Sequence, residues 1–292
     1  MKFAQKCHTK DGNRINTRTF PKKLIAIALL LTVVLQWPVH GQQQMNPSDG
    51  LEIRLMPYFW MPSVEADDAT IDGLSGSVEM GFDDILDYLD FAAMGRVEAW
   101  KGKWGLTFDG VFMNLSEDRG YKGSRGVTNF SVDVDARLGM ADFGLAYRLF
   151  EAGFGSENEQ RLTLEPYGGI RYGYLRQKID LHVNIAGVGS RGAGLGGSED
   201  WVEPFAGGRV RWDLNKKFVV YLMGDAGGFG IGSASDLLWQ FTAGLNYRLS
   251  ERTSLNAGYR IVDLDYSRGS GASEFGVDLQ AKGPFLGMTI LY

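Results

Sequence analysis

The stretch that decides the fold is the end of the chain, KGPFLGMTILY at residues 282–292. Within it, Leu286, Met288, Ile290 and Tyr292 are each separated by a single residue. Because side chains alternate between the two faces of a strand, these four would form one apolar face. The stretch therefore predicts a strand that faces either the core of a soluble domain or the lipid of a membrane.

The start of the chain indicates export. Seven Lys or Arg residues precede an apolar run at residues 24–35, and Val39-His40-Gly41 then offers a cleavage site before Gln42. The apolar run is too short to span a bilayer as a helix, which takes about 20 residues. We therefore expect a signal peptide at residues 1–41, a linker at 42–50 and one domain at 51–292.

The rest of the sequence contains no candidate transmembrane helix. In lipid, only helices and closed barrels satisfy every backbone hydrogen-bonding group. An exported protein that stays in a membrane would therefore have to cross it with strands. The choice narrows to an outer-membrane barrel or a soluble periplasmic or secreted domain.

Composition agrees with export and excludes several functions. The single cysteine, Cys7, lies in the expected signal, so the mature chain would have no disulfide, no thiolate nucleophile and no cysteine metal site. Residues 1–41 hold seven of the 30 basic and one of the 35 acidic residues, which leaves 23 basic and 34 acidic residues and a net charge of −11. This balance argues against nucleic acid as a partner. The 40 Gly, 17 Phe, 12 Tyr and 7 Trp suit a barrel.

Ten alternating segments follow one another along the domain, with short and long connections in turn. They cover residues 51–60, 92–100, 104–115, 130–150, 161–185, 201–214, 218–229, 237–249, 254–266 and 275–292. An even number of strands with alternating connection lengths is typical of bacterial barrels, whose termini both lie in the periplasm. The fold class we predict is all-β: an antiparallel transmembrane β-barrel of about ten strands, with eight or twelve as alternatives.

The two faces of the predicted strands differ in polarity. In residues 237–249 the apolar residues share one parity and the polar residues the other, as expected for lipid outside and a polar lumen inside. In residues 130–150 the apolar parity changes between Gly139 and Asp142. We expect a β-bulge there, because one extra residue reverses the faces. A second change of parity occurs near Gly283-Pro284, where we also expect a bulge.

The predicted inward face is rich in charge. EPYGGIR at residues 165–171 recurs as EPFAGGR at 203–209, with an even spacing that puts Glu and Arg on the same face. Charges in a narrow interior must pair, because an unpaired one is costly. We expect either a structural ion-pair core or a substrate-binding or ion-selective lumen. The candidate luminal residues are Arg54, Arg96, Glu98, Asp109, Asp133, Asp135, Arg137, Glu165, Arg171, Glu203, Arg209, Arg211, Asp225 and Arg260.

The first long connection contains a helical pattern. Phe82, Ile85, Leu86 and Leu89 recur at helical spacing, with four aspartates on the opposite face. This predicts a short amphipathic helix at residues 82–90. The helix would either plug the lumen or pack on the rim of the barrel.

We expect no catalytic, metal or cofactor site. His182 is the only histidine after the expected signal and lacks the neighbouring serine of an outer-membrane lipid hydrolase. The four aspartates near residue 85 do not follow the calcium-loop spacing. Gly187, Gly189 and Gly192 match a dinucleotide-binding pattern, but no amphipathic helix follows, which favours a flexible loop.

Several motifs together resemble a known family. PYFWMP at 57–62, FDDILDYLDF at 82–91, KGKWG at 101–105, GDAGGFG at 224–230 and GYR at 258–260 resemble a family of uncharacterised bacterial outer-membrane β-barrel proteins. The last residues are also similar to the terminal sorting signal of such proteins, carried by Phe285, Gly287, Ile290 and Tyr292. The resemblance implies an outer-membrane location and a barrel fold. It assigns no reaction and no ligand.

The sequence therefore favours a membrane protein without enzymatic activity. Its leading function would be structural support or limited passage of small polar solutes through a narrow, charge-lined lumen. The alternative is a binding or adhesion module that uses the long loops, and an enzyme acting on lipid or peptide is third. The expected partners are outer-membrane lipids and the barrel-assembly machinery; the oligomeric state stays open.

Overall fold

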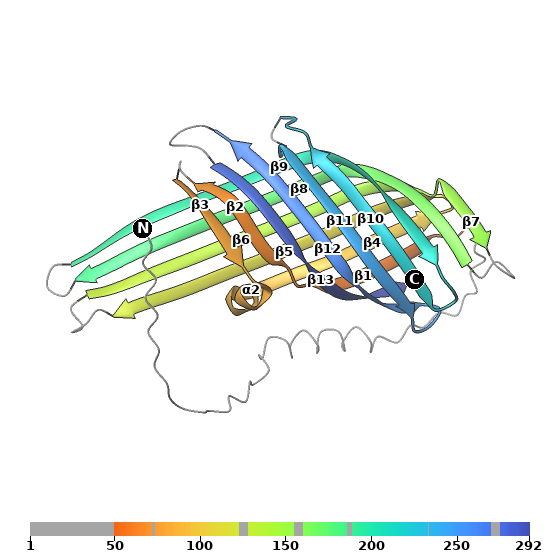
Figure 1. The fold of residues 1–292 in the computed structure, drawn as a ribbon, viewed down its shortest axis with the longest axis horizontal. Coiled ribbons are helices and arrows are strands. Elements are labelled where there is room, and N and C mark those ends of the chain that lie inside the picture. Colours follow the sequence, from red (N-terminus) through yellow and green to blue (C-terminus); the bar gives the residue numbers. More distant parts are fainter. Residues whose placement is uncertain are drawn as a thin grey trace, which may run out of the picture. The chain divides into compact units, whose positions relative to one another are not determined.

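The computed structural model describes residues 50–71, 74–122, 128–154, 160–185, 189–232, 234–269 and 275–292. The expected signal peptide and the linker up to residue 49 lie outside these residues. The described elements, labelled in Figure 1, are β1 (Glu52–Trp60), β2 (Ser63–Ile71), β3 (Leu74–Met80), α2 (Phe82–Tyr88), β4 (Leu89–Lys101), β5 (Trp104–Lys122), β6 (Thr128–Tyr147), β7 (Phe150–Phe154), β8 (Gln160–Ile185), β9 (Gly189–Asp213), β10 (Phe218–Gly228), β11 (Leu237–Arg248), β12 (Thr253–Arg268) and β13 (Phe275–Leu291). None of the described helical residues forms a segment long and apolar enough to cross a membrane.

Ten of the strands close into a barrel. They pair in the order β1, β4, β5, β6, β8, β9, β10, β11, β12 and β13, and β1 also pairs with β13, so the first and last strands meet. All pairings are antiparallel. The predicted barrel of about ten strands is therefore confirmed. Outside this ring, β7 pairs with β8, and the β2–β3 hairpin pairs with the outer part of β13.

The short turns lie at one end of the barrel, together with the start of β1 and the end of β13. β4 and β5 are joined by only Gly102 and Lys103, and β9 and β10 by residues 214–217. At the same end the Ile53 amide donates to the Tyr292 carbonyl at 3.1 Å, and the Tyr292 amide donates back at 2.9 Å. We call this the short-turn end. In bacterial barrels the short turns and the termini face the periplasm.

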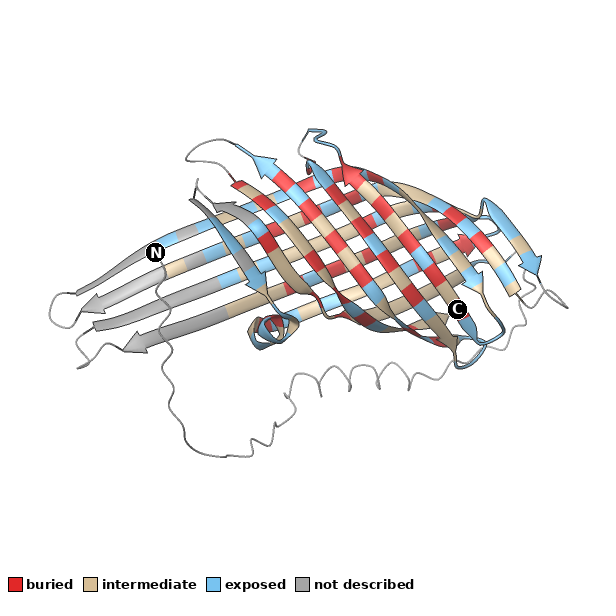
Figure 2. Ribbon diagram, viewed as in Figure 1, coloured by how far each residue is buried: buried red, intermediate tan, exposed pale blue. Residues whose placement is uncertain are grey.

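The outer surface of the barrel is an apolar band. Along β11 and β12, buried residues alternate with more exposed ones, and Figure 2 shows the same alternation over the coloured part of the wall. Leu106, Phe143 and Ile170 are each more than half exposed on the outward face. Near the short-turn end, aromatic rings lie in pairs, such as Trp104 with Tyr147 at 4.7 Å and Phe218 with Tyr247 at 5.0 Å between ring centres. This surface matches the lipid-facing band and interfacial aromatics of membrane barrels.

Four adjacent strands extend past the rest of the barrel. β5, β6, β8 and β9 have 19, 20, 26 and 25 residues, and Figure 1 shows them projecting together on the side opposite the short turns. We call this extension the projecting sheet. It includes residues 189–199, which the sequence predicted as a Gly-rich loop; that prediction is wrong because their backbone pairs with β8 from Gly189 onward.

Neither predicted bulge is present. The β5–β6 pairing runs without a shift from Trp104↔Tyr147 to Lys122↔Asn129, and the β12–β13 pairing is continuous through Gly283. The apolar parity changes because the surroundings of the strand change. Phe143 faces outward into the apolar band, whereas Leu138 and Met140 face inward onto the core. The face of a strand that carries apolar residues thus differs between its two halves.

A hydrophobic core fills the inside of the barrel away from the short turns. Three of its members are Trp201, Leu238 and Val262. Each lies on the same strand as a buried polar residue, respectively Glu203, Gln240 and Arg260, and is two residues farther from the short-turn end than that residue. The cluster consists of Trp60, Leu175, Trp201, Tyr221, Met223, Leu238, Val262, Leu264, Tyr266, Phe275, Val277, Ala281 and Phe285. Apart from Tyr221 and Met223, which precede Asp225 on β10 and so lie nearer the short turns, the interior is divided along its length into an apolar part and a polar part.

Candidate functional site

The polar part of the interior is built from pairs of opposite charge on neighbouring strands. The register places Arg54 opposite Glu98, Arg96 opposite Asp109, Asp142 opposite Arg171, Arg171 opposite Glu203, and Glu165 opposite Arg209. Side chains opposite each other on one face of a sheet are direct neighbours. The alternation of the strands and their register thus bring these charges together without any loop.

Arg171 is the centre of one cluster and is fully buried. Its Nε donates to Asp142 Oδ1 at 2.7 Å, and its Nη2 donates to Asp142 Oδ2 at 2.8 Å and to Asp225 Oδ1 at 2.6 Å. The guanidinium also lies 4.9 Å from the centre of the Phe205 ring. A two-pronged contact of this kind fixes both partners in position.

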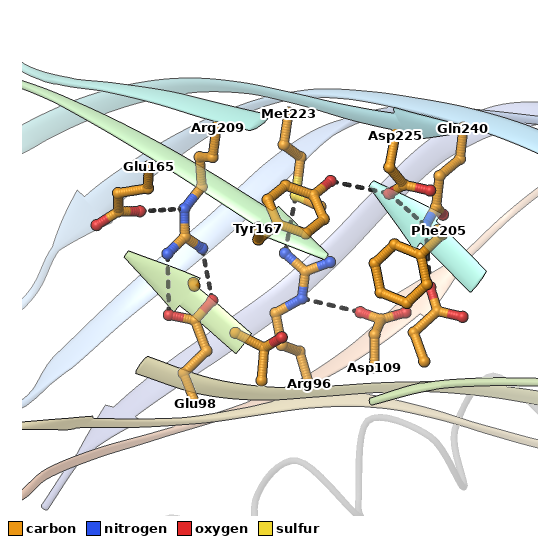
Figure 3. Close-up of a pocket in the computed structure, with 13 residues that line it drawn as sticks. Arg96, Glu98, Asp109, Glu165, Tyr167, Phe205, Arg209, Met223, Asp225 and Gln240 are labelled. Carbon is orange, nitrogen blue, oxygen red and sulfur yellow. Dashed lines mark hydrogen bonds and ion pairs between the residues drawn. The ribbon is translucent and has the colours of Figure 1, made fainter. Parts of the chain in front are cut away.

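Arg209 is the centre of a second cluster, shown in Figure 3. Its Nε donates to Glu165 Oε2 at 2.6 Å, and its Nη1 and Nη2 donate to the two oxygens of Glu98 at 2.5 and 3.1 Å. The Trp100 indole donates to Glu98 Oε2 at 2.9 Å, and Arg148 lies 3.5 Å from Glu165. Both carboxylates are thus held from more than one side.

Asp109 joins two further arginines. Arg96 Nε donates to Asp109 Oδ2 at 2.9 Å, and Arg260 Nη1 lies 3.2 Å from Asp109 Oδ1. The Tyr58 hydroxyl donates to Asp109 Oδ1 at 3.0 Å and accepts from Arg260 at 2.7 Å. Arg260 also donates to Gln240 Oε1 at 2.5 Å.

Gln240 connects this third cluster to the first. Its Nε2 donates to Asp142 Oδ2 at 3.0 Å and to Asp225 Oδ2 at 2.9 Å, and the Tyr167 hydroxyl donates to Asp225 Oδ2 at 2.8 Å. We call the combined set the ionic belt. It comprises Tyr58, Arg96, Glu98, Asp109, Asp142, Glu165, Tyr167, Arg171, Arg209, Asp225, Gln240 and Arg260.

The ionic belt leaves little free space. The cavity among its residues has a volume of about 30 Å³. This is room for about one or two water molecules. Together with the apolar core beyond it, the belt fills the cross-section of the barrel with side chains.

Glu203 anchors an outer connection to the interior. The Ser235 hydroxyl donates to Glu203 Oε2 at 2.5 Å, the Ser235 amide donates to the same oxygen at 3.2 Å, and both residues are fully buried. The connection can enter because Gly228 has φ +92° and a Cβ there would lie 2.3 Å from the Ser235 hydroxyl. A side chain at Gly228 is therefore excluded by both conformation and space.

The structure brings together most of the predicted luminal residues. Arg96, Glu98, Asp109, Glu165, Arg171, Arg209, Asp225 and Arg260 belong to the ionic belt, and Glu203 lies against it. Arg54 lies 2.5 Å from Glu52 and 3.7 Å from Glu98, and Arg211 pairs with Asp213 at 3.2 Å, nearer the short-turn end.

Three predicted residues do not belong to this set. Asp135 and Arg137 are exposed and lie on the outward parity of β6, because the expected bulge is absent. Arg137 instead donates to Asn114 at 3.1 Å on the projecting sheet. Asp133 has the same parity, and its side chain lies outside the described set. The sequence analysis missed Asp142. Without a bulge, Asp142 has the same parity as the inward residues Leu138 and Met140 and therefore also faces inward.

The helix α2 lies against the wall. Ile85 is buried, and the Phe82 ring lies 6.3 Å from the ring of Phe59, a residue of the outward parity of β1. Leu86 belongs to the helix, and the fourth residue of the predicted apolar face, Leu89, begins β4 instead. The predicted short helix is confirmed, and its contacts place it on the wall.

The residues of the expected sorting signal lie at the seam where β13 meets β1. Phe285 is buried inside the barrel opposite Trp60, and Gly287 lies opposite Tyr58. Ile290 pairs with Leu55, and Tyr292 is half exposed at the short-turn end. Their role in sorting stays a prediction.

No family model matches the chain, and no curated protein is similar to it in sequence. Solved structures are similar in fold. The outer membrane protease OmpT of Escherichia coli has 8% identity and a TM-score of 0.48, with 84% of this chain and 98% of that chain covered. The translocator domain of the autotransporter NalP of Neisseria meningitidis has 12% identity and a TM-score of 0.37, with coverage of 92% and 95%.

A third similar structure is Ail, the attachment invasion locus protein of Yersinia pestis, with 12% identity, a TM-score of 0.30 and coverage of 84% and 99%. At such low identity the likeness concerns the fold alone. The barrel fold that the resemblance implies is confirmed by the closed ring of ten paired strands in this chain.

Proposed function

We propose that this protein is a closed outer-membrane barrel with a structural, non-enzymatic role, and that no solute passes through its interior. The observation that carries the proposal is the filled cross-section: a cavity of about 30 Å³ in the ionic belt, followed by the apolar core. Small polar solutes such as sugars are larger than this space. Of the two roles that the sequence left open, support of the membrane fits this interior better than passage.

Opening the belt would be costly. Arg171 and Arg209 each bind two carboxylates, so a channel along the axis requires that buried opposite charges separate. Breaking a buried ion pair costs about 3–5 kcal/mol when one partner is left without the other. Thermal fluctuation would therefore open such a channel rarely.

The proposal includes no catalysis. Asp109, Asp142, Glu98, Glu165 and Asp225 each accept a hydrogen bond from an arginine. A carboxylate held in this way is a poor general base, because accepting a proton would remove the negative charge that pairs with the arginine. These contacts support a structural role for the acids of the belt.

A solute-uptake assay tests the proposal. Liposomes that contain the folded protein are transferred to an isotonic solution of arabinose, and swelling reports entry of the sugar. We expect the swelling rate of protein-free liposomes, while liposomes with an open porin swell quickly. Swelling above the protein-free rate, which rises with the amount of protein, would contradict a closed barrel.

The projecting sheet supports a second candidate function, binding at the cell surface. A tilted strand crosses a membrane with about 9–11 residues, whereas β8 and β9 have 26 and 25. The excess length would display the β5–β6 and β8–β9 hairpins outside the membrane. A variant without residues 117–134, compared with the intact protein at equal surface level, should then adhere less to a surface to which the intact protein adheres; equal adherence would argue against this function.

A further inference from the structure

Between the ionic belt and the short turns, the interior widens into an open cavity of about 650 Å³, which we call the vestibule. Its wall consists of inward residues of β1, β4 and β9 to β13, and its rim includes the turns at residues 216–217 and 249–252. The belt residues Arg96, Glu98 and Arg209 form its floor. The vestibule is therefore separate from the small cavity inside the belt, and it opens on the side that faces the periplasm in bacterial barrels.

The vestibule contains an excess of positive charge. Eight Lys or Arg residues line it, against three Glu residues, so cations exceed acids by five. Arg96 and Arg209 are paired within the belt. The others, which we call the vestibule cations, are Arg54, Arg211, Lys216, Lys217, Arg248 and Arg252.

At least four of the vestibule cations have a partner: Arg54 lies 2.5 Å from Glu52, Arg211 and Arg248 share Asp213, and Lys216 is also not free. Arg211 Nε and Arg248 Nη2 both donate to the same oxygen, Asp213 Oδ1, each at 3.2 Å. Within the described part of the chain, neither Lys217 nor Arg252 has an acid within ion-pair distance. A carboxylate that two guanidiniums share neutralises only one of them.

The positive charge of the vestibule is opposite in sign to the net charge of the chain. The full sequence has a formal net charge of −5, and residues 42–292 alone have a net charge of −11. Cations gathered at the mouth of a low-dielectric barrel repel one another and focus a positive potential toward the opening. A bound anion would relieve that repulsion.

We propose that the vestibule binds a small anion with at least two phosphate or carboxylate groups, taken up from the short-turn side. Guanidinium groups present paired donors that match the oxygens of phosphate and carboxylate. A volume of about 650 Å³ is within the usual range of small-ligand pockets, about 300–1,000 Å³. Because the vestibule ends at the belt, binding there needs no passage through the barrel, and the proposal does not depend on the function proposed above.

Calorimetric titration of the folded protein in an uncharged detergent tests the site. The probes are inorganic pyrophosphate, citrate and orthophosphate. Pyrophosphate compared with citrate distinguishes recognition of phosphate from recognition of carboxylate. Pyrophosphate compared with orthophosphate distinguishes two phosphate groups from one. We expect saturable binding of pyrophosphate or citrate, at one per chain, with at least about tenfold weaker binding of orthophosphate. Absence of saturable binding of both multivalent anions at millimolar concentration would overturn the proposal.

Two paired variants locate the binding. In Lys217→Gln with Arg252→Gln, two vestibule cations that lack acidic partners are removed, and we expect the affinity for pyrophosphate or citrate to fall about tenfold or more. The matched control, Lys101→Gln with Lys103→Gln, removes the same charge from an exposed turn at the same end. Heat-dependent gel migration confirms that both are folded. An equal loss in the control would show a general charge effect and overturn the proposal.

Discussion

The ionic belt and the vestibule are both lined by arginines, yet the two regions differ in how these charges are balanced. The belt has four arginines and five carboxylates; the carboxylates, Arg171 and Arg260 are buried, and the arginines donate to the carboxylates at 2.5–3.2 Å. The vestibule is open and has more cations than acids. In the belt each arginine donates to carboxylates of the same set, whereas the lining of the vestibule holds five more cations than acids, the excess from which we propose a bound anion. The two regions thus share arginine as a main cation but differ in the sign of their net charge.

The largest expected effect is in the belt. Arg171→Met should lower the free energy of unfolding by about 3–5 kcal/mol, because Asp142 and Asp225 lose their counter-charge in a buried site. Urea unfolding in detergent micelles measures the change. Arg211→Gln in the vestibule is the matched control and should cost less than about 1 kcal/mol, since its site is open to water. Similar losses in both variants would remove the distinction between the regions.

The second prediction concerns coupling within the belt. Arg209→Ala and Glu165→Ala should each destabilise the protein, and the double variant should lose about 0.5–3 kcal/mol less than the sum, because the first change already leaves the other charge without its partner. Unfolding of all four proteins under the same conditions gives the coupling energy. Additive losses would mean that the two residues do not share a network.

The third prediction tests the anchor of the outer connection. Ser235→Ala should cost about 1–3 kcal/mol, because Glu203 loses a buried hydroxyl donor. Ser267→Ala serves as the control, since its hydroxyl donates to Asp236 in an exposed position and its loss should cost no more than about 0.5 kcal/mol. If the control is as damaging as Ser235→Ala, the buried contact with Glu203 has no special weight.

The smallest expected effect is that of removing α2. When residues 82–88 are replaced by a Gly-Ser linker of equal length, the single-channel current should stay absent, because the helix packs on the wall beside Phe59. Current through a folded linker variant, with none through the intact protein, would show that the helix acts as a plug.

The wall of the barrel was predictable from the sequence because it depends on local patterns. Alternation with period two and short polar turns such as Lys101-Gly102-Lys103 are visible in a single sequence. The helix at residue 82 is equally local. Strand ends were harder, because residues 189–199 are rich in Gly, which suggests a loop, yet their backbone pairs with β8.

The site was only partly predictable. Inward parity identified Glu165, Arg171 and Arg209, but the face of Asp135 was wrong because one strand passes from lipid into water, and its outward residues change from apolar to polar. The contacts of Gln240 with Asp142 and Asp225 depend on the stagger of strands far apart in the chain. No spacing in the sequence reports that stagger.

Ion current through the intact protein tests the closure of the belt most directly. Folded protein is added to planar lipid bilayers in concentrated potassium chloride, and its insertion is verified independently by protease protection. We predict no stepwise current above that of protein-free bilayers, because the belt and the apolar core fill the interior. Reproducible current steps from the intact protein would contradict the account.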